Sequence, residues 1–298
     1  MNPLLRTLKV FVIASMVAVA CGGGGAVMAR VGDVEITEGD LAALYEARSM
    51  PVGEEMRTAL FRLAAQEALL IAMEADFGVQ PDEDEIEQTY QALVSDLEAR
   101  GMTPAQALGV PDAGLGMLRF NAKLVVIRAD VTDHLLRSPE YLDALFAAGI
   151  GVTTVCVKHV LLETAEEADE VIERLEDGED IGDVAEDVSL DTAERGDLGC
   201  RAVSEFVTDF AIAAMDAELG EPHGPVQSPF GWHVLVVSAR SVLDRAVVEA
   251  DPRQFISTVD ASAAWTSWFN DALRDAQVEV EPRFGTWTPT GISAPSDE

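Results

Sequence analysis

Four residues with chemically useful side chains lie within residues 153–240, and they are His159, Asp191, Ser228 and His233. A serine with a histidine and an aspartate could hydrolyse an acyl bond, but Ser228 lies in no strand-to-helix nucleophile elbow. Two histidines and an aspartate could also hold zinc. A third use is structural, because a buried histidine pair can simply hold two strands together. The surrounding sequence must decide among these uses.

Each of the four residues belongs to a recognisable short segment. The first segment is β-rich and carries His159, and the last carries both Ser228 and His233. The segments, in chain order, are Thr153–Leu162, Val188–Asp191, Gly196–Gly199 and Gly224–Val237. Their order and spacing resemble the parvulin family of peptidyl-prolyl cis–trans isomerases.

The resemblance implies an α+β fold, in which helices surround a four-stranded antiparallel sheet. It implies that His159, Asp191, Ser228 and His233 form one hydrogen-bonded cluster beneath the substrate amide, where they tune electrostatics and attack nothing. It implies no metal and no cofactor. By the same resemblance, the substrate-binding residues are Leu198, Phe206, Phe210 and Phe230, with Phe206 in place of a commoner methionine.

Two departures from the family pattern bear on activity. The segment after His159 contains Glu163, Glu166 and Glu167, where phosphate-directed parvulins carry basic residues. Because acidic side chains repel a phosphate, we expect no preference for phosphorylated ligands. The second departure is Cys200-Arg201, where an aromatic pair is common, so Arg201 could alter the mouth of the pocket.

The chain has three cysteines, and their use follows from the expected compartment. Cys21 is assigned to a lipid anchor, which leaves Cys156 and Cys200 as an even pair in an oxidising environment. In the parvulin fold their two segments lie close together, so the resemblance implies a disulfide. The alternative is two buried free thiols.

The first residues have the features of an export signal. Arg6 and Lys9 form a positive region, and Val10–Ala20 is apolar but short for a membrane span. Ala18-Val19-Ala20-Cys21 resembles a bacterial lipobox, which implies cleavage before Cys21 and acylation of its thiol. The alternative is an ordinary secretory signal with a spare cysteine. Both place the protein outside the cytoplasm.

Composition excludes some partners. The formal net charge is −33, from 53 acidic and 20 basic residues, and 48% of the 298 residues are hydrophobic. Without a basic surplus the chain is not expected to bind nucleic acid, nor to dock on an anionic membrane through protein charge. Its membrane contact is expected only through the lipid.

Outside the parvulin segment, helical patterns dominate. Val27–Ile36 is expected to form strands around a Gly32-Asp33 turn, followed by helices at Glu54–Phe77, from Pro81, at Leu115–Leu136 and from Pro139. Thr37 is expected to cap a helix, with Asp40 as a weak capping-box partner. The opening Ala29–Thr37 resembles SurA-type periplasmic chaperones, in which a C-terminal helix packs back on the N-terminal lobe.

The expected organisation therefore has six parts. They are a signal peptide at 1–20, a tether at 21–26, a helical lobe at 27–150, a parvulin domain at 152–241, a C-terminal helix and strand at 250–288, and a disordered tail at 289–298. The expected function is isomerisation of X–Pro bonds in unfolded exported proteins. The alternative is a holdase chaperone whose isomerase domain is weak or vestigial.

Overall fold

The computed structural model describes residues 24–45 and 50–295. The proposed signal peptide and Cys21 lie outside the described residues. The chain divides into two compact units, of which the first comprises residues 1–127 and 270–298 and the second residues 128–269. The second unit is inserted between two segments of the first, and it is longer than the segment 152–241 expected to form the parvulin domain.

A three-stranded antiparallel sheet joins the two ends of the first unit. Its order is β2-β1-β7, with β1 at Val27–Val31, β2 at Val34–Thr37 and β7 at Val278–Val280. Ala29 of β1 faces Val280 of β7. The strand expected within residues 250–288 is thus present as β7 and pairs with β1.

The helices of this unit begin and end largely where their capping residues predict. They are α1 (Glu38–Leu44), α2 (Glu54–Phe77), α3 (Glu83–Arg100), α4 (Pro104–Leu108) and the first part of α5 (Leu115–Arg137), whose residues 128–137 belong to the second unit. Thr37 and Asp40 form a complete capping box, and Gly78 ends α2 in a left-handed conformation. The expectation for Pro81 was wrong, because Asp82 caps α3 by accepting two backbone N–H groups.

The tail predicted to be disordered at 289–298 is a wrong expectation for residues 289–295, since the structure describes an ordered hairpin there. β8 (Thr286–Thr288) pairs with β9 (Gly291–Ser293) across Pro289 and Thr290. Ile292 is buried, and the ring of Trp287 stacks on Phe61 with centroids 5.1 Å apart. These contacts bury apolar surface and so stabilise the hairpin, and the local sequence alone does not predict them.

In the second unit, the segments around the β-sheet are helical. They are α6 (Pro139–Ala148), α10 (Arg245–Ala250) and the first part of α11 (Thr258–Asp275), whose residues 270–275 belong to the first unit. Pro139 occupies the first turn of α6, as predicted. Residues 241–250, between the segments expected to form the parvulin domain and the C-terminal helix, are the end of a strand followed by α10. Asp244 caps this helix by accepting the N–H of Ala246.

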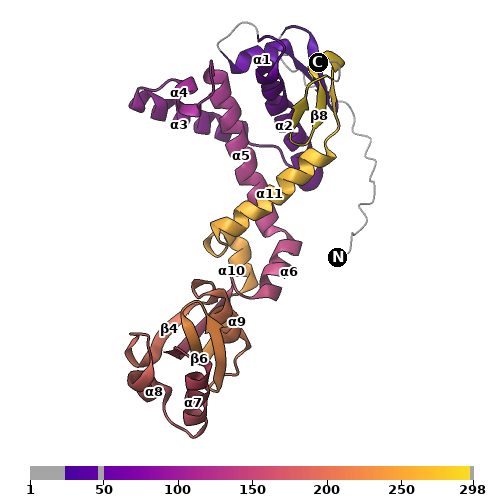
Figure 1. Ribbon diagram of the computed structural model, residues 1–298. Coiled ribbons are helices and arrows are strands. Elements are labelled where there is room, and N and C mark those ends of the chain that lie inside the picture. Colours follow the sequence, from indigo (N-terminus) through magenta and orange to yellow (C-terminus); the bar gives the residue numbers. More distant parts are fainter. Residues whose placement is uncertain (1–23, 46–49, 296–298) are drawn as a thin grey trace. The chain divides into compact units, whose positions relative to one another are not determined.

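The sheet of the second unit has four antiparallel strands in the order β4-β3-β6-β5. Figure 1 labels two of them, β4 and β6. The strands are β3 (Thr153–Leu162), β4 (Asp197–Ala202), β5 (Pro222–Ser228) and β6 (Gly231–Val242), and the helices are α7 (Ala165–Glu176), α8 (Ile181–Val188) and α9 (Thr208–Asp216). This confirms the predicted α+β class. The two longest strands, β3 and β6, lie at the centre.

Side chains alternate between the two faces of this sheet. On one face Val160 and Val234 pack under α7 and α8, and on the other Val157 and Leu235 pack under α9. His159 and His233 are adjacent in sequence to Val160 and Val234, so both lie on the α9 face. The strand period therefore brings the two predicted histidines to one side.

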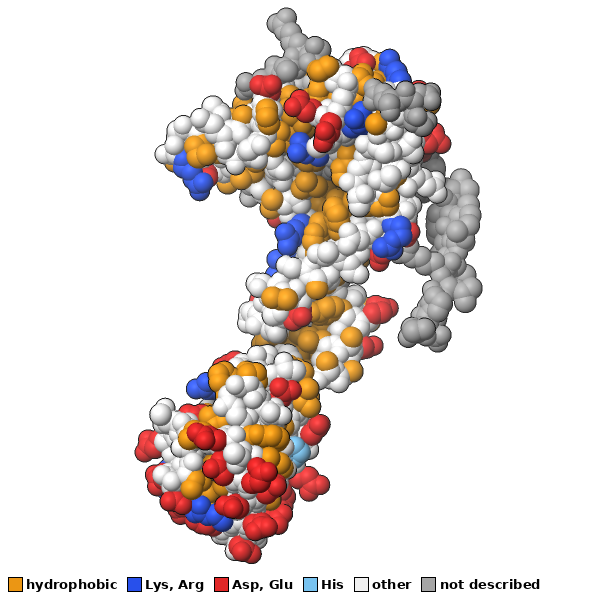
Figure 2. Space-filling view, in the orientation of Figure 1, with side chains coloured by type: hydrophobic (Ala, Val, Ile, Leu, Met, Phe, Trp, Pro, Cys, Tyr) orange, Lys and Arg blue, Asp and Glu red, His pale blue; other side chains and the backbone are white. Residues whose placement is uncertain are grey.

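Acidic side chains gather on the surface of the second unit (Figure 2). α7 and α8 contribute many of them, including exposed Glu166, Glu170 and Asp183. Within residues 24–45 and 50–295, no helix is both long and apolar enough to cross a membrane.

Candidate active site

The four predicted residues form one hydrogen-bonded chain on the α9 face. Asp191 Oδ2 lies 2.8 Å from His159 Nε2, and His159 Nδ1 lies 3.2 Å from His233 Nδ1. His233 Nε2 lies 2.7 Å from Ser228 Oγ. Both histidines are almost fully buried, at 3% and 4% exposure. The resemblance thus selected residues that come together in space.

The end groups fix the direction of every hydrogen bond in this chain. The Asp191 carboxylate accepts only, so His159 Nε2 carries a proton and, in a neutral ring, His159 Nδ1 accepts. His233 Nδ1 must then donate, which leaves His233 Nε2 to accept from the Ser228 hydroxyl. Ser228 Oγ in turn accepts the N–H of Phe230 at 3.1 Å. With both imidazoles neutral, each group in the chain has a partner.

The pKa values agree with neutral imidazoles. Burial, together with the neighbouring His159, lowers the pKa of His233 to about 4, and the charge of Asp191 opposes this change. Burial also lowers the pKa of His159, although the hydrogen bond and charge of Asp191 oppose that change. Burial acts to raise the pKa of Asp191, but hydrogen bonds from the Ala193 N–H and from His159 outweigh it and lower that pKa.

This electrostatic setting predicts a pH dependence of stability. Between about pH 6.5 and about pH 4, unfolded His233 binds a proton that the folded residue does not bind. The free energy of unfolding should therefore decrease as the pH falls through this window, by at most about 1.4 kcal/mol per pH unit for this group. Denaturant unfolding at several pH values measures the slope. His233→Asn should make it shallower, and parallel curves would contradict the assignment.

Asp191 is held in place by a residue that the sequence had not singled out as functional. Ser189 Oγ accepts the backbone N–H of Leu161 at 3.1 Å and that of Asp191 at 3.2 Å. The N–H of Leu190 also donates to the carbonyl of Leu161. Ser189 therefore ties the loop after α8 to β3. A serine side chain in a loop often accepts the backbone N–H two residues on, and this tendency could have revealed the role.

Three predicted pocket residues lie together above the histidines. The buried Phe210 ring meets His159 edge to face at 5.6 Å and His233 at 5.2 Å. Phe206 lies 5.0 Å from Phe210, and Leu198 packs on the same cluster. The arrangement is an apolar wall over a polar chain, as a proline ring beside its amide requires.

The fourth predicted pocket residue does not join them. Phe230 lies at the turn between β5 and β6 and is 69% exposed. Its backbone supports Ser228, while its side chain contributes to no buried cluster in the described part of the chain. In residues 24–45 and 50–295 there is also no group of three or more histidine, cysteine or acidic side chains placed to hold a metal ion.

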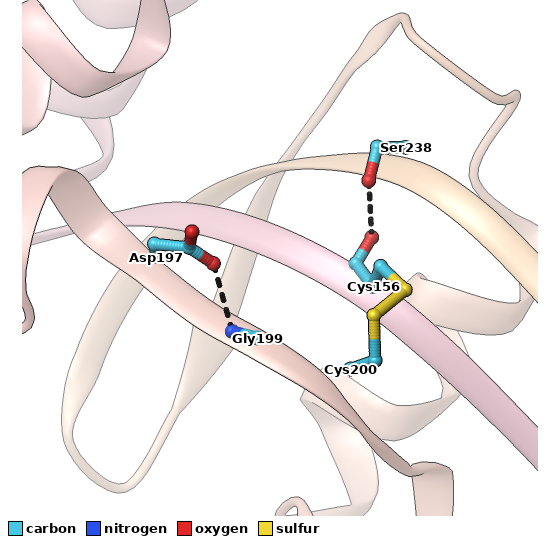
Figure 3. Close-up of a disulfide and its surroundings, with 5 residues drawn as sticks. All are labelled: Cys156, Asp197, Gly199, Cys200 and Ser238. Carbon is cyan, nitrogen blue, oxygen red and sulfur yellow. Dashed lines mark hydrogen bonds between the residues drawn. A yellow bond between two sulfur atoms is a disulfide. The ribbon is translucent and has the colours of Figure 1, made fainter.

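Cys156 and Cys200 form a disulfide between β3 and β4 (Figure 3). The two cysteines face each other directly in the antiparallel register. β3 also carries His159, and β4 also carries Leu198. The disulfide therefore links a strand of the hydrogen-bonded chain to a strand of the pocket.

Residues 156–239 match the model of the PPIC-type PPIase domain in the rotamase family. Among curated proteins, foldase protein PrsA of Oceanobacillus iheyensis is 40% identical over 89 residues, which are 29% of this chain and 30% of that protein. Chaperone SurA of Thiobacillus denitrificans is 33% identical over 150 residues, covering 45% of this chain and 34% of the chaperone. The chain thus spans about a third of the length of these relatives.

The crystal structure of the peptidylprolyl isomerase PrsA from Bacillus cereus has a similar fold. It covers 87% of this chain and 95% of its own, with a TM-score of 0.56 and 17% identity. This likeness concerns the fold over most of the chain, whereas the family match concerns one segment. Residues 156–239 are therefore a PpiC-type parvulin domain of the peptidyl-prolyl isomerase family, in a chain with a PrsA-like fold.

Proposed function

We propose that this protein catalyses cis–trans isomerisation of X–Pro bonds in unfolded exported proteins, outside the cytoplasm and anchored by a lipid on Cys21. The observation that carries the proposal is the directed chain from Ser228 to Asp191 beneath the wall of Phe210, Phe206 and Leu198. Relatives named foldase PrsA and chaperone SurA support the assignment to assisted folding.

The reaction needs no nucleophile. An X–Pro amide must lose its resonance to rotate, at a barrier of about 18–20 kcal/mol. A catalyst must hold the proline ring, exclude water and favour the twisted amide over both planar forms. Leu198, Phe206 and Phe210 supply the apolar grip. The neutral imidazoles of His159 and His233 supply oriented dipoles that need no reorganisation when the amide twists.

The polar chain also holds its own geometry. Asp191 fixes the tautomer of His159, and that tautomer sets the donor and acceptor atoms of His233. Ser228 completes the chain at the other end. Since each hydrogen bond depends on its neighbour, removing one ring should disturb the whole chain.

His233→Ala tests this function most directly. Exchange between cis and trans forms of a short proline peptide, measured by NMR, should slow on the order of tenfold or more, because two hydrogen bonds worth about 1 kcal/mol each are lost. His223→Ala is the matched control, since His223 lies on β5 outside the chain and its removal should leave the rate unchanged. Equal rates for wild type and His233→Ala would end the proposal.

The same experiment separates the second candidate function. PrsA and SurA relatives also suggest a holdase, in which the helical lobe grips clients and the isomerase is vestigial. If wild type fails to accelerate exchange but still suppresses aggregation of an unfolded client, the holdase function stands and the enzymatic one does not.

We expect no preference for phosphorylated substrates. The segment after β3 carries Glu163 and Glu167, and the Glu167 carboxylate is engaged in capping α7 through the N–H groups of Glu163 and Thr164. A phosphoserine before proline would meet this negative charge. Turnover of a Ser-Pro peptide should therefore fall on phosphorylation. Faster turnover of the phosphorylated peptide would refute the expectation.

A further inference from the structure

The strand that carries Leu198 is irregular at that residue. β4 is the edge strand of the sheet and pairs only with β3. Cys200 faces Cys156 and Asp197 faces Lys158, so two residues of β4, Leu198 and Gly199, lie opposite one residue of β3. This is a β-bulge, and Gly199 adopts a left-handed conformation within it.

The bulge is fixed at both ends by local contacts. At one end the disulfide joins Cys200 to Cys156, and at the other Asp197 Oδ1 accepts the N–H of Gly199 at 2.8 Å (Figure 3). Most of β4 is exposed, including Gly199 within the bulge and Arg201 beyond Cys200. A short, exposed edge strand contributes little burial of its own and opens readily.

We propose that the Cys156–Cys200 disulfide is a positioning element of the pocket, which pins the bulge of β4 and so holds Leu198 against Phe206 and Phe210. The polar chain does not depend on β4, because its histidines lie on the central strands β3 and β6. Opening the disulfide therefore weakens the grip on proline and leaves the twisting step intact. This inference rests on the proposed isomerase function.

Reduction of the folded protein is the first test. A dithiol reductant breaks the S–S bond, the two cysteine sulfurs become thiols, and the reductant is itself oxidised to a cyclic disulfide. We expect KM for a proline peptide to rise about tenfold, as for a displaced wall of an apolar pocket. The kcat should stay within about twofold, since lost uniform binding raises KM alone. Amide hydrogen exchange should accelerate in β4 and not in β6.

Two variants keep the test sharp. Cys156→Ala/Cys200→Ala should show the raised KM and should not respond to the reductant, which controls for effects through Cys21. Adding Thr154→Cys/Ala202→Cys places a new disulfide at the pair two residues along, which is the same kind of antiparallel pair, and should restore KM.

The outcomes decide the matter. An unchanged KM on reduction, an equal fall in kcat, or a new disulfide that forms without restoring KM would each overturn the positioning role. If the oxidised protein shows no catalysis, the proposed function fails instead. Hydrogen exchange in β4, with and without reductant, still tests the pinning in that case.

Discussion

Gly196→Ala should lower the free energy of unfolding by roughly 2–5 kcal/mol and abolish most of the isomerase activity. The left-handed conformation of Gly196 accounts for about 1–2 kcal/mol and overpacking for about 1–3 kcal/mol. A Cβ at this position would lie 2.2 Å from the carbonyl oxygen of His159. That carbonyl belongs to β3, which is paired on both sides, so relief of the clash must displace the histidine itself.

Gly178→Ala is the matched control in the same unit. Gly178 also has a positive φ, but no atom lies within 4 Å of a Cβ built there. Gly178→Ala should lower the free energy of unfolding only by the cost of the left-handed backbone conformation, about 1–2 kcal/mol, and should leave the isomerase activity unchanged. Denaturant unfolding and peptide exchange of both variants give the comparison. Equal losses in the two would show that the contact with His159 is unimportant.

Phe210→Ala is expected to have the other large effect. Phe210 is 3% exposed and its ring meets both histidines, so its removal leaves a cavity between α9 and the sheet. Truncation of a buried phenylalanine costs about 3–5 kcal/mol of stability. Since the same ring walls the pocket, kcat/KM should fall about a hundredfold or more.

Two further variants distinguish the roles of the aromatic wall. Phe206→Ala removes a half-buried ring that contacts Phe210 and forms no ring contact with the histidines, so it should mainly raise KM and cost less stability. Phe210→Leu should recover most of the stability by refilling the cavity. If Phe206→Ala and Phe210→Ala had equal effects on kcat, the edge-to-face contacts of Phe210 with the histidines would not contribute to catalysis.

Local signals were sufficient for the long helices and for much of the site. Gly78 and Pro139 mark helix ends because their backbone preferences act within one turn. The strands bearing His159 and His233 follow from β-rich runs, and the family resemblance selected the partners Asp191 and Ser228. The identities of the four residues in the hydrogen-bonded chain could therefore be predicted from the sequence.

Other features depend on contacts between distant residues. The hairpin around Pro289 is stabilised by Trp287 stacking on Phe61, which nothing in the local sequence indicates. The helix expected to begin at Pro81 begins at Glu83 instead, because Asp82 is its N-cap. The direction of the hydrogen bonds between His159 and His233 was likewise out of reach, since it follows from the atoms facing each other across the sheet.

The neutral state of the two rings bears on how the domain responds to salt. Dissolved ions screen charges that are separated through water, but they have little effect on dipoles in contact inside a buried site. The prolyl amide carries no net charge before, during or after its rotation. The affinity of such a pocket for a prolyl peptide should therefore change little between low and high ionic strength, whereas the affinity of a binding site made of ion pairs would fall. For a protein proposed to work beyond the controlled interior of the cell, that indifference to ionic strength is a practical advantage.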